Sequence, residues 1–349
     1  EIPSGGPYYV VSRNLGAQIG IAVGLLFYMG TAFAGSMYAL GAIEALTGGF
    51  GFSLFPFGTQ LLAIVLVMLA GGTVQIGLKF VNQASLIFLS AVIVSVLMVL
   101  VGLAMSAANN NIALMPKFTH DDDLGKTPDV FTLLSILFPG FTGIMAAVNR
   151  SGSLREPGKS IPMGTLGAIL VTFLINLAVI WLCGSSVPRH DLLNDKFVAS
   201  TYSWPLSSLT VIGVAISSVG ALLQCCVGAP GLLEALAKDE LVPILNRFRK
   251  SENPNRALHA TLIICALPCL VGNLDFIVPI VTMSFLLMYM AINFGCFLLV
   301  SLKEPSFRPT WKYYSSSSCF GGSILCLCMM FAISWYTALV AIGLASCLY

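Results

Sequence analysis

The stretch at residues 131–161 limits the folds open to this chain, because an apolar segment is interrupted there at what should be membrane depth. Pro139, Gly140 and Gly143 fall within five positions. Proline removes a backbone donor and clashes with the preceding turn, while glycine costs roughly 1 kcal/mol in a helix interior. We therefore expect regular helix to fail between residues 138 and 143.

A broken helix has consequences inside a membrane. An unpaired backbone group costs several kcal/mol in hydrocarbon, so a break survives only where it is buried in protein or lines a wet cavity. Freed carbonyls can hold a cation, and the amides that open the second half-helix, at Gly143, Ile144 and Met145, can hold an anion. The sequence thus predicts an ion site at this break.

Composition places the chain in the lipid bilayer. It is 57% hydrophobic and 9% charged, whereas a soluble domain carries about 25% charged residues. A transmembrane helix needs about 20 apolar residues. We expect ten spans, at residues 18–45, 59–76, 86–107, 131–148, 162–183, 206–236, 258–271, 277–300, 320–333 and 335–349. Residues 1–17 are expected to be a polar cytoplasmic loop, and residues 18–349 the transmembrane domain.

The basic residues predict the orientation. Thirteen of the seventeen lysines and arginines fall on one side of the expected spans, which leaves Lys117, Lys126, Arg189 and Lys196 on the other. Positive residues in short loops mark the cytoplasmic side. The acidic segment at residues 108–130 is then extracytoplasmic, and the broken helix runs from outside to inside.

Several function classes are excluded by the same residues. The basic side chains are scattered among short loops, so no nucleic-acid partner is expected. The ten cysteines lie in or beside apolar segments and are expected to be buried single thiols. The three histidines lack metal-ligand spacing. There is no GxxxxGK[ST] motif, and the spans carry no paired acids or activated nucleophile, so we expect neither an enzyme nor a cofactor.

Long blocks of the sequence resemble the cation-chloride cotransporters, a branch of the amino acid, polyamine and organocation transporter superfamily. The blocks are FPGFTGIMAAVNRSGSL with KSIPMGT, similar to the sixth helix and its following loop; VGALLQCCVGAPGLLEALAKDELVPIL, similar to the eighth; NLDFIVPIVTMSFLLMYMAINFGCFLL, similar to the ninth and tenth; and RPTWKYY with ISWYTALVAIGLASCLY, similar to the last two. The resemblance covers nearly the whole chain in order. It implies an all-α integral membrane protein with the inverted-repeat transporter fold.

Within that family the chain looks closer to the potassium-chloride branch, including its plant-type members. The resemblance implies a symporter that moves K+ together with Cl− by alternating access. The residues that match the family's potassium ligands are Tyr38, Pro139 and Thr142. Those that match its chloride ligands are the amides of Gly143, Ile144 and Met145 and the hydroxyl of Tyr289.

Each of these residues also has a plain structural interpretation. Tyr38 and Tyr289 have the character of packing or interface residues, and the proline that of a simple kink. The Thr142 hydroxyl can bond back to its own helix. Glu44 and Glu234, near the ends of expected spans, fit a snorkelling or ion-paired role better than a role in ion coupling.

The eighth helix bears on the choice of cation. Sodium-coupled relatives carry two adjacent serines there, and an ungapped match anchored on ALAKDE places that pair at Val219 and Gly220. Ser217 and Ser218 lie two residues earlier, which is about 200° around a helix. The expected sodium site lacks hydroxyls, which favours K+ with Cl−. A sodium-potassium-chloride or amino acid carrier stays the alternative.

The resemblance begins at the family's third helix and ends at its twelfth. Helices one and two and the C-terminal cytoplasmic regulatory domain have no counterpart here, so either the sequence is a piece of a longer protein or the protein does not transport. A non-transporting regulatory subunit is therefore a further alternative. For the full-length protein we expect a homodimer in the plasma membrane or a Golgi or endosomal membrane. The short segment at residues 108–130 indicates a plant or protist type.

Overall fold

The computed structural model describes residues 6–52, 55–109, 130–145, 148, 154, 156–240, 242–249, 255–305, 307, 309, 311 and 313–348. Over these residues the chain forms helices and no strands, which confirms the predicted all-α class. Residues 110–129 of the acidic segment, and residues 146 and 147 of the predicted second half-helix, lie outside the described residues.

The helices follow the predicted order of spans. Seven are long and apolar enough to cross a membrane: α2 (Ala17–Phe50), α3 (Gly58–Ile76), α4 (Leu78–Asn109), α7 (Pro157–Ser186), α10 (Ser207–Lys238), α12 (Leu274–Ser301) and α13 (Ser316–Ile333). Two shorter apolar helices are α11 (Arg256–Val271) and α14 (Trp335–Leu348). The remaining expected span, at residues 131–148, is interrupted as predicted: it begins as α5 (Val130–Leu137) and continues as the 3-10 turn η2 (Phe138–Phe141).

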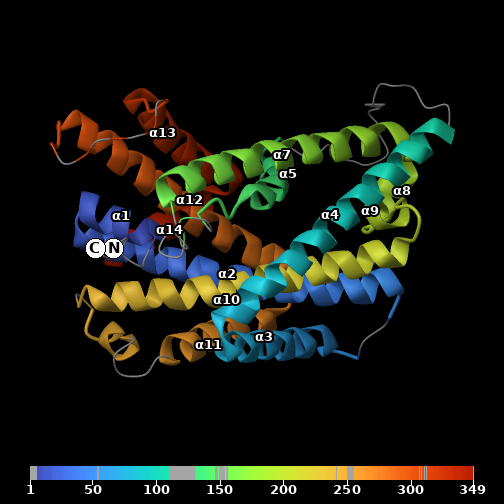
Figure 1. Ribbon diagram of the computed structural model, residues 1–349, viewed down its shortest axis with the longest axis horizontal. Helices are drawn as coiled ribbons and strands as arrows, with labels where there is room; N and C mark the ends of the chain where they lie inside the picture. The colour runs from blue at the N-terminus through green and yellow to red at the C-terminus, as the bar shows by residue number, and fades with distance from the viewer. Residues whose placement is uncertain are drawn as a thin grey trace.

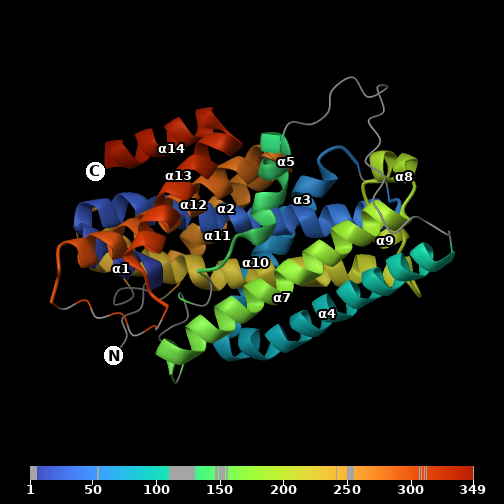
Figure 2. The ribbon, with the colours of Figure 1, turned by 90° about the horizontal axis from the view of Figure 1, so that it is seen from above.

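These helices lie side by side in a bundle (Figure 1). Seen from above, α4 and α7 flank one side, α13 and α14 flank the other, and α2 and α10 lie between them (Figure 2). Helix α7 packs against α4 and leaves most of its apolar side chains exposed, as a lipid-facing helix does. It begins five residues before the predicted boundary, because Pro157 suits the first turn of a helix.

Helix α2 is the centre of the bundle, in contact with α1, α3, α10, α11, α12 and α14. Its apolar residues run around the whole helix, which is the pattern of a helix buried on all sides. Glycines let its neighbours approach closely. A Cβ on Gly30 would lie 2.5 Å from the Cβ of Ser284 on α12, and one on Gly35 would lie 2.9 Å from the Sγ of Cys265 on α11.

The predicted N-terminal loop contains a helix, α1 (Gly6–Leu15), which packs against α2, α10 and α12. The Tyr8 hydroxyl donates to the carboxylate of Asp239 at the end of α10, and Ser12 donates to the same oxygen at 3.1 Å. Burial and the Asp239 hydrogen bond raise the pKa of Tyr8. The expectation of a loop was therefore wrong for residues 6–15. Their anchor, Asp239, lies 231 residues after Tyr8, so the nearby sequence gave no sign of it.

Hydrogen bonds and ion pairs to carboxylates fix the connection between α7 and α10. It contains the short helices α8 (Arg189–Asn194) and α9 (Val198–Thr201). Tyr202 donates to Asp191 at 2.6 Å. This bond lowers the pKa of the Asp191 carboxyl, and it raises the pKa of Tyr202 to about 12. Lys196 forms an ion pair with Glu44 on α2, which places Glu44 in the ion-paired role that we expected.

We expect Tyr8→Phe to destabilise the protein by about 1.5–3 kcal/mol, the usual worth of a hydrogen bond to a charged group. The ring would keep its packing, while Asp239 would lose one of its two hydroxyl donors. Thermal unfolding in detergent measures the effect. Tyr9→Phe is the matched control, because Tyr9 is exposed and its contact with Arg13 uses the ring. Equal midpoints for the two variants would contradict the assigned anchor.

We expect Tyr202→Phe to increase hydrogen exchange of the α8 and α9 amides at neutral pH, relative to Tyr313→Phe, an exposed tyrosine. In the wild type the contact stabilises the fold above the ordinary pKa of Asp191, because its folded-state pKa is lowered. That stability is lost as the pH falls through the folded value. Protection, corrected for intrinsic exchange, should therefore fall only below about pH 4. Loss of protection near pH 6 would show that another group controls this segment.

Candidate functional site

The predicted break is confirmed at Thr142 and Gly143. After η2, Thr142 is extended, with φ −77° and ψ 168°, and Gly143 has φ +95°, a conformation that favours glycine. The Thr142 amide and hydroxyl both donate to the carbonyl of Pro139, at 3.3 Å and 2.7 Å. The hydroxyl therefore makes the local backbone bond that the plain interpretation expected. This hydrogen bond also keeps the Pro139 carbonyl oxygen next to the Thr142 hydroxyl oxygen, and both residues are predicted potassium ligands.

Tyr289 on α12, 146 residues further along the chain, contacts this break. The Gly143 amide donates to its hydroxyl at 3.2 Å, and the Ile144 amide interacts with the same hydroxyl. Tyr289 is 8% exposed, whereas Gly143 and Ile144 are exposed, so the tyrosine side of this contact is buried and the backbone side is open. Three of the four predicted chloride ligands are thus brought together. Met145 follows directly in the turn and is partly buried.

Tyr38 joins the same place from α2. Its hydroxyl interacts electrostatically with Tyr289 and with Cys225 of α10. Hydroxyl and carbonyl oxygens are the ligands that hard cations prefer, and amide donors are those that anions prefer. At the break, oxygen atoms of Pro139 and Thr142 thus lie next to the amide of Gly143, and Tyr38 is linked to this group through Tyr289.

Cysteines form the wall of α10 and α11 behind Tyr38. The Sγ of Cys265 and the Cβ of Cys225 lie 2.9 Å and 3.4 Å from the position of a Cβ on Gly35. Both thiols are free, but the expectation that all ten cysteines are buried was wrong, since Cys328 and Cys347 are exposed. Sequence reasoning missed this wall, although Gly35 on α2 and the cysteine pair on α10 were its visible signals. The wall offers sulfur rather than oxygen, so it adds no hard ligand for a cation.

The predicted sodium position on α10 is closely packed. A Cβ on Gly220 would lie 2.7 Å from the Phe88 ring of α4, so this position faces a neighbouring helix. Val219 packs at the edge of the core. The hydroxyl of Ser217 donates to the carbonyl of Val214 at 2.8 Å. Neither of the two matched positions offers a hydroxyl.

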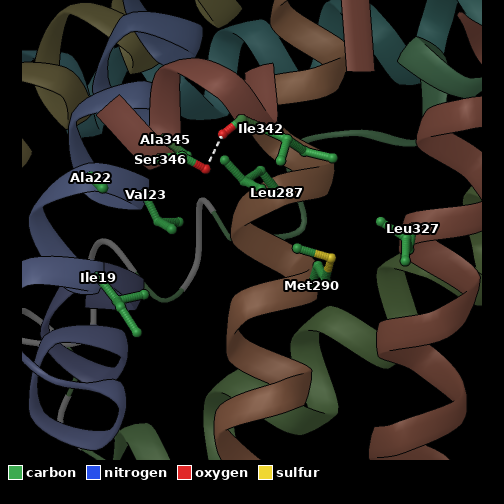
Figure 3. A pocket seen from close by; sticks show the side chains of 9 residues that line it. All are labelled: Ile19, Ala22, Val23, Leu287, Met290, Leu327, Ile342, Ala345 and Ser346. Atoms are coloured by element: carbon green, nitrogen blue, oxygen red, sulfur yellow. Dashed lines mark hydrogen bonds between the residues drawn. The ribbon is translucent and has the colours of Figure 1, made fainter. Parts of the chain in front are cut away.

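A cavity of about 520 Å³ lies elsewhere, between α2, α12, α13 and α14 (Figure 3). Its walls are aliphatic side chains such as Ile19, Leu287 and Met290. The one hydroxyl among its lining residues, on Ser346, is used by the carbonyl of Ile342 at 2.8 Å. Such a surface cannot replace the hydration of an ion. The break at Thr142 and Gly143, beside Tyr289 of α12, is therefore the candidate site, and this cavity is not.

We expect Gly143→Ala to destabilise the break by about 1–2 kcal/mol, because an alanine is strained at positive φ. Space is not the reason, since nothing lies within 4 Å of the added Cβ. Gly140→Ala is the matched control: its Cβ also meets nothing within 4 Å, and its φ is not positive. Thermal unfolding of both variants measures the difference. If Gly140→Ala costs as much as Gly143→Ala, the strain at Gly143 is not the cause.

Comparison with known proteins agrees with this geometry. The family model for amino acid permeases matches residues 2–349. Three similar curated proteins are cation-chloride cotransporter 1 of Arabidopsis thaliana, at 37% identity, and cation-chloride cotransporters 1 and 2 of Oryza sativa subsp. japonica, at 36% and 35%. Each alignment covers 99% of this chain and 40% of the relative, so the chain spans less than half the length of these relatives. The predicted resemblance to cation-chloride cotransporters is confirmed, and the chain belongs to the amino acid permease family.

Proposed function

We propose that the protein of this chain is a secondary transporter that moves K+ together with Cl− across a membrane by alternating access. The observation that carries the proposal is the contact of the Gly143 amide with the Tyr289 hydroxyl, at a helix break beside Tyr38. An anion placed there would take hydrogen bonds from the amides of residues 143–145 and from the tyrosine. The amides of Gly143 and Ile144 now point to the Tyr289 hydroxyl, so an anion would have to replace that hydroxyl as their partner.

The cation is proposed from the chemistry of the oxygens. The carbonyl of Pro139 and the hydroxyls of Thr142 and Tyr38 are uncharged hard ligands, which suit a weakly hydrated alkali cation. Close packing of Gly220 against Phe88 supports the absence of a sodium site. Because the opposite charges lie close together, each ion lowers the cost of dehydrating the other, which favours joint transport.

The relatives are cation-chloride cotransporters by name, and those names support chloride as one of the ions without specifying the cation. The homodimer and the plasma or Golgi and endosomal location stay predictions for the full-length protein. No substrate chemistry is proposed, since ion gradients supply the free energy.

The test is rubidium-86 uptake by cells that express the gene encoding this chain, with chloride replaced by gluconate and sodium by N-methylglucamine. We expect uptake to fall when chloride is replaced and to stay unchanged when sodium is replaced. Tyr289→Phe removes one hydrogen bond to the anion and should raise the chloride concentration for half-maximal uptake roughly three- to tenfold. Tyr38→Phe should likewise raise the rubidium concentration for half-maximal uptake.

Tyr28→Phe is the control for general damage. Tyr28 is a buried tyrosine on the same helix as Tyr38, and its hydroxyl pairs with Thr261 at 3.2 Å. This variant should lower thermal stability without shifting either ion dependence. Uptake that requires sodium would move the proposal to a sodium-potassium-chloride carrier. No ion-dependent uptake, with the protein present at the membrane, would favour an amino acid carrier or a regulatory subunit.

A further inference from the structure

One face of α11 is exposed from its first residue to its last turn. Its exposed positions include Arg256, His259, Ile263, Leu267 and Leu270. Steps of three and four residues put these positions on one side of a helix. The first two are polar and the other three are apolar. The basic residues before α11 predict that it begins at the cytoplasmic side, so this face has a polar cytoplasmic end and an apolar part within the membrane.

Gln75, near the end of α3, belongs to the polar end of this face. The Nε2 atoms of Gln75 and His259 lie 3.2 Å apart, within hydrogen-bond distance. Helix α3 packs against α11 along the lower edge of the bundle in Figure 1. The bond orients the imidazole about one turn from Arg256, whose guanidinium carries five N–H donors. Polar side chains from two helices therefore meet at the predicted depth of the lipid headgroups.

The connection before α11 adds positive charge. Its 3-10 turn η4 (Leu245–Phe248) packs against α10 and α11, and Arg247 in this turn is exposed. Residues 238–256 carry five basic and three acidic side chains, and one of the acids, Glu240, pairs with Arg249. Basic residues directly cytoplasmic of a membrane helix attract anionic phospholipids. The charge at this end of α11 therefore complements a negative headgroup.

An apolar hollow of about 200 Å³ lies toward the other end of the same face. Its lining includes Phe33 of α2, Leu267, Pro268 and Val271 of α11, and Phe276 and Ile280 of α12. Leu267 is eight residues after His259, which is about 12 Å along the helix. One leaflet of the hydrocarbon is about 15 Å deep. An acyl chain whose headgroup lies beside His259 can therefore reach the hollow.

We propose that this face of α11 binds an anionic phospholipid of the cytoplasmic leaflet. Arg256 and His259 hold the phosphate, and one acyl chain runs over Ile263 and Leu267 into the hollow. The polar end selects the headgroup, because a phosphate accepts charge-assisted hydrogen bonds. The hollow holds the chain by van der Waals packing, which distinguishes one apolar surface from another in a bilayer. Lipid binding here is independent of the ions that the protein moves, because Cys265, in the wall behind Tyr38, lies on the opposite side of α11.

The test measures lipid binding to the purified protein by native mass spectrometry, with phosphatidylserine and phosphatidylcholine that carry the same oleoyl chains. We expect the wild type to bind phosphatidylserine roughly five- to tenfold more tightly. Arg256→Gln should weaken phosphatidylserine binding about fivefold, the effect of one basic residue at an anionic membrane surface, and leave phosphatidylcholine binding unchanged. Arg256→Lys keeps the charge and should keep the preference. Arg189→Gln is the matched control, since Arg189 is also exposed but lies on the predicted extracytoplasmic side.

A second pair of variants tests the hollow. Leu267→Trp fills it and should weaken binding of both lipids by the same factor, whereas Leu177→Trp, at an exposed position of α7, should change neither. Equal affinities of the wild type for the two lipids would overturn the proposal. So would equal losses in Arg256→Gln and Arg189→Gln, or in Leu267→Trp and Leu177→Trp. Displacement of phosphatidylserine by an equal concentration of inorganic phosphate would show that the site recognises phosphate alone, which also contradicts a lipid site.

Discussion

Every backbone amide and carbonyl inside the hydrocarbon needs a partner within the protein, and the site depends on how that need is met at the break. Thr142 pairs locally with Pro139, whereas Gly143 reaches Tyr289, a residue 146 positions away. The local bond forms wherever the proline interrupts the helix. The distant bond forms only when α12 is in place. The break and Tyr289 therefore stabilise each other, because without the tyrosine the Gly143 amide would lose its hydrogen-bond partner.

Helix α2 holds α12 in that place. Gly30 lets Ser284 of α12 come into direct contact, and Gly35 does the same for Cys265 of α11. The same helix carries Tyr38 to the site and ends near Glu44, which is held by Lys196 of the connection between α7 and α10. One buried helix thus fixes the distance between the candidate site and the connection between α7 and α10.

Local chemistry made part of this structure predictable. The break was predicted from Pro139 and Gly143 because both disfavour regular helix. Proline alone does not decide it, since Pro230 lies inside α10 and Pro279 inside α12. The meeting of Gly143 with Tyr289 was expected only through the family resemblance, since no spacing in the sequence indicates it. Helix α1 and the role of Tyr8 were missed because Asp239 is far away in the chain.

The Tyr289 hydroxyl accepts from Gly143 and still has its own proton to give. Under the proposed function, an anion at the break would accept a hydrogen bond from the Gly143 amide and another from the Tyr289 hydroxyl, so both groups would exchange one partner for another. Binding would then cost the protein one internal hydrogen bond, which release would restore. Such an exchange would favour a short residence of the ion, which turnover in a carrier requires and a storage site would avoid.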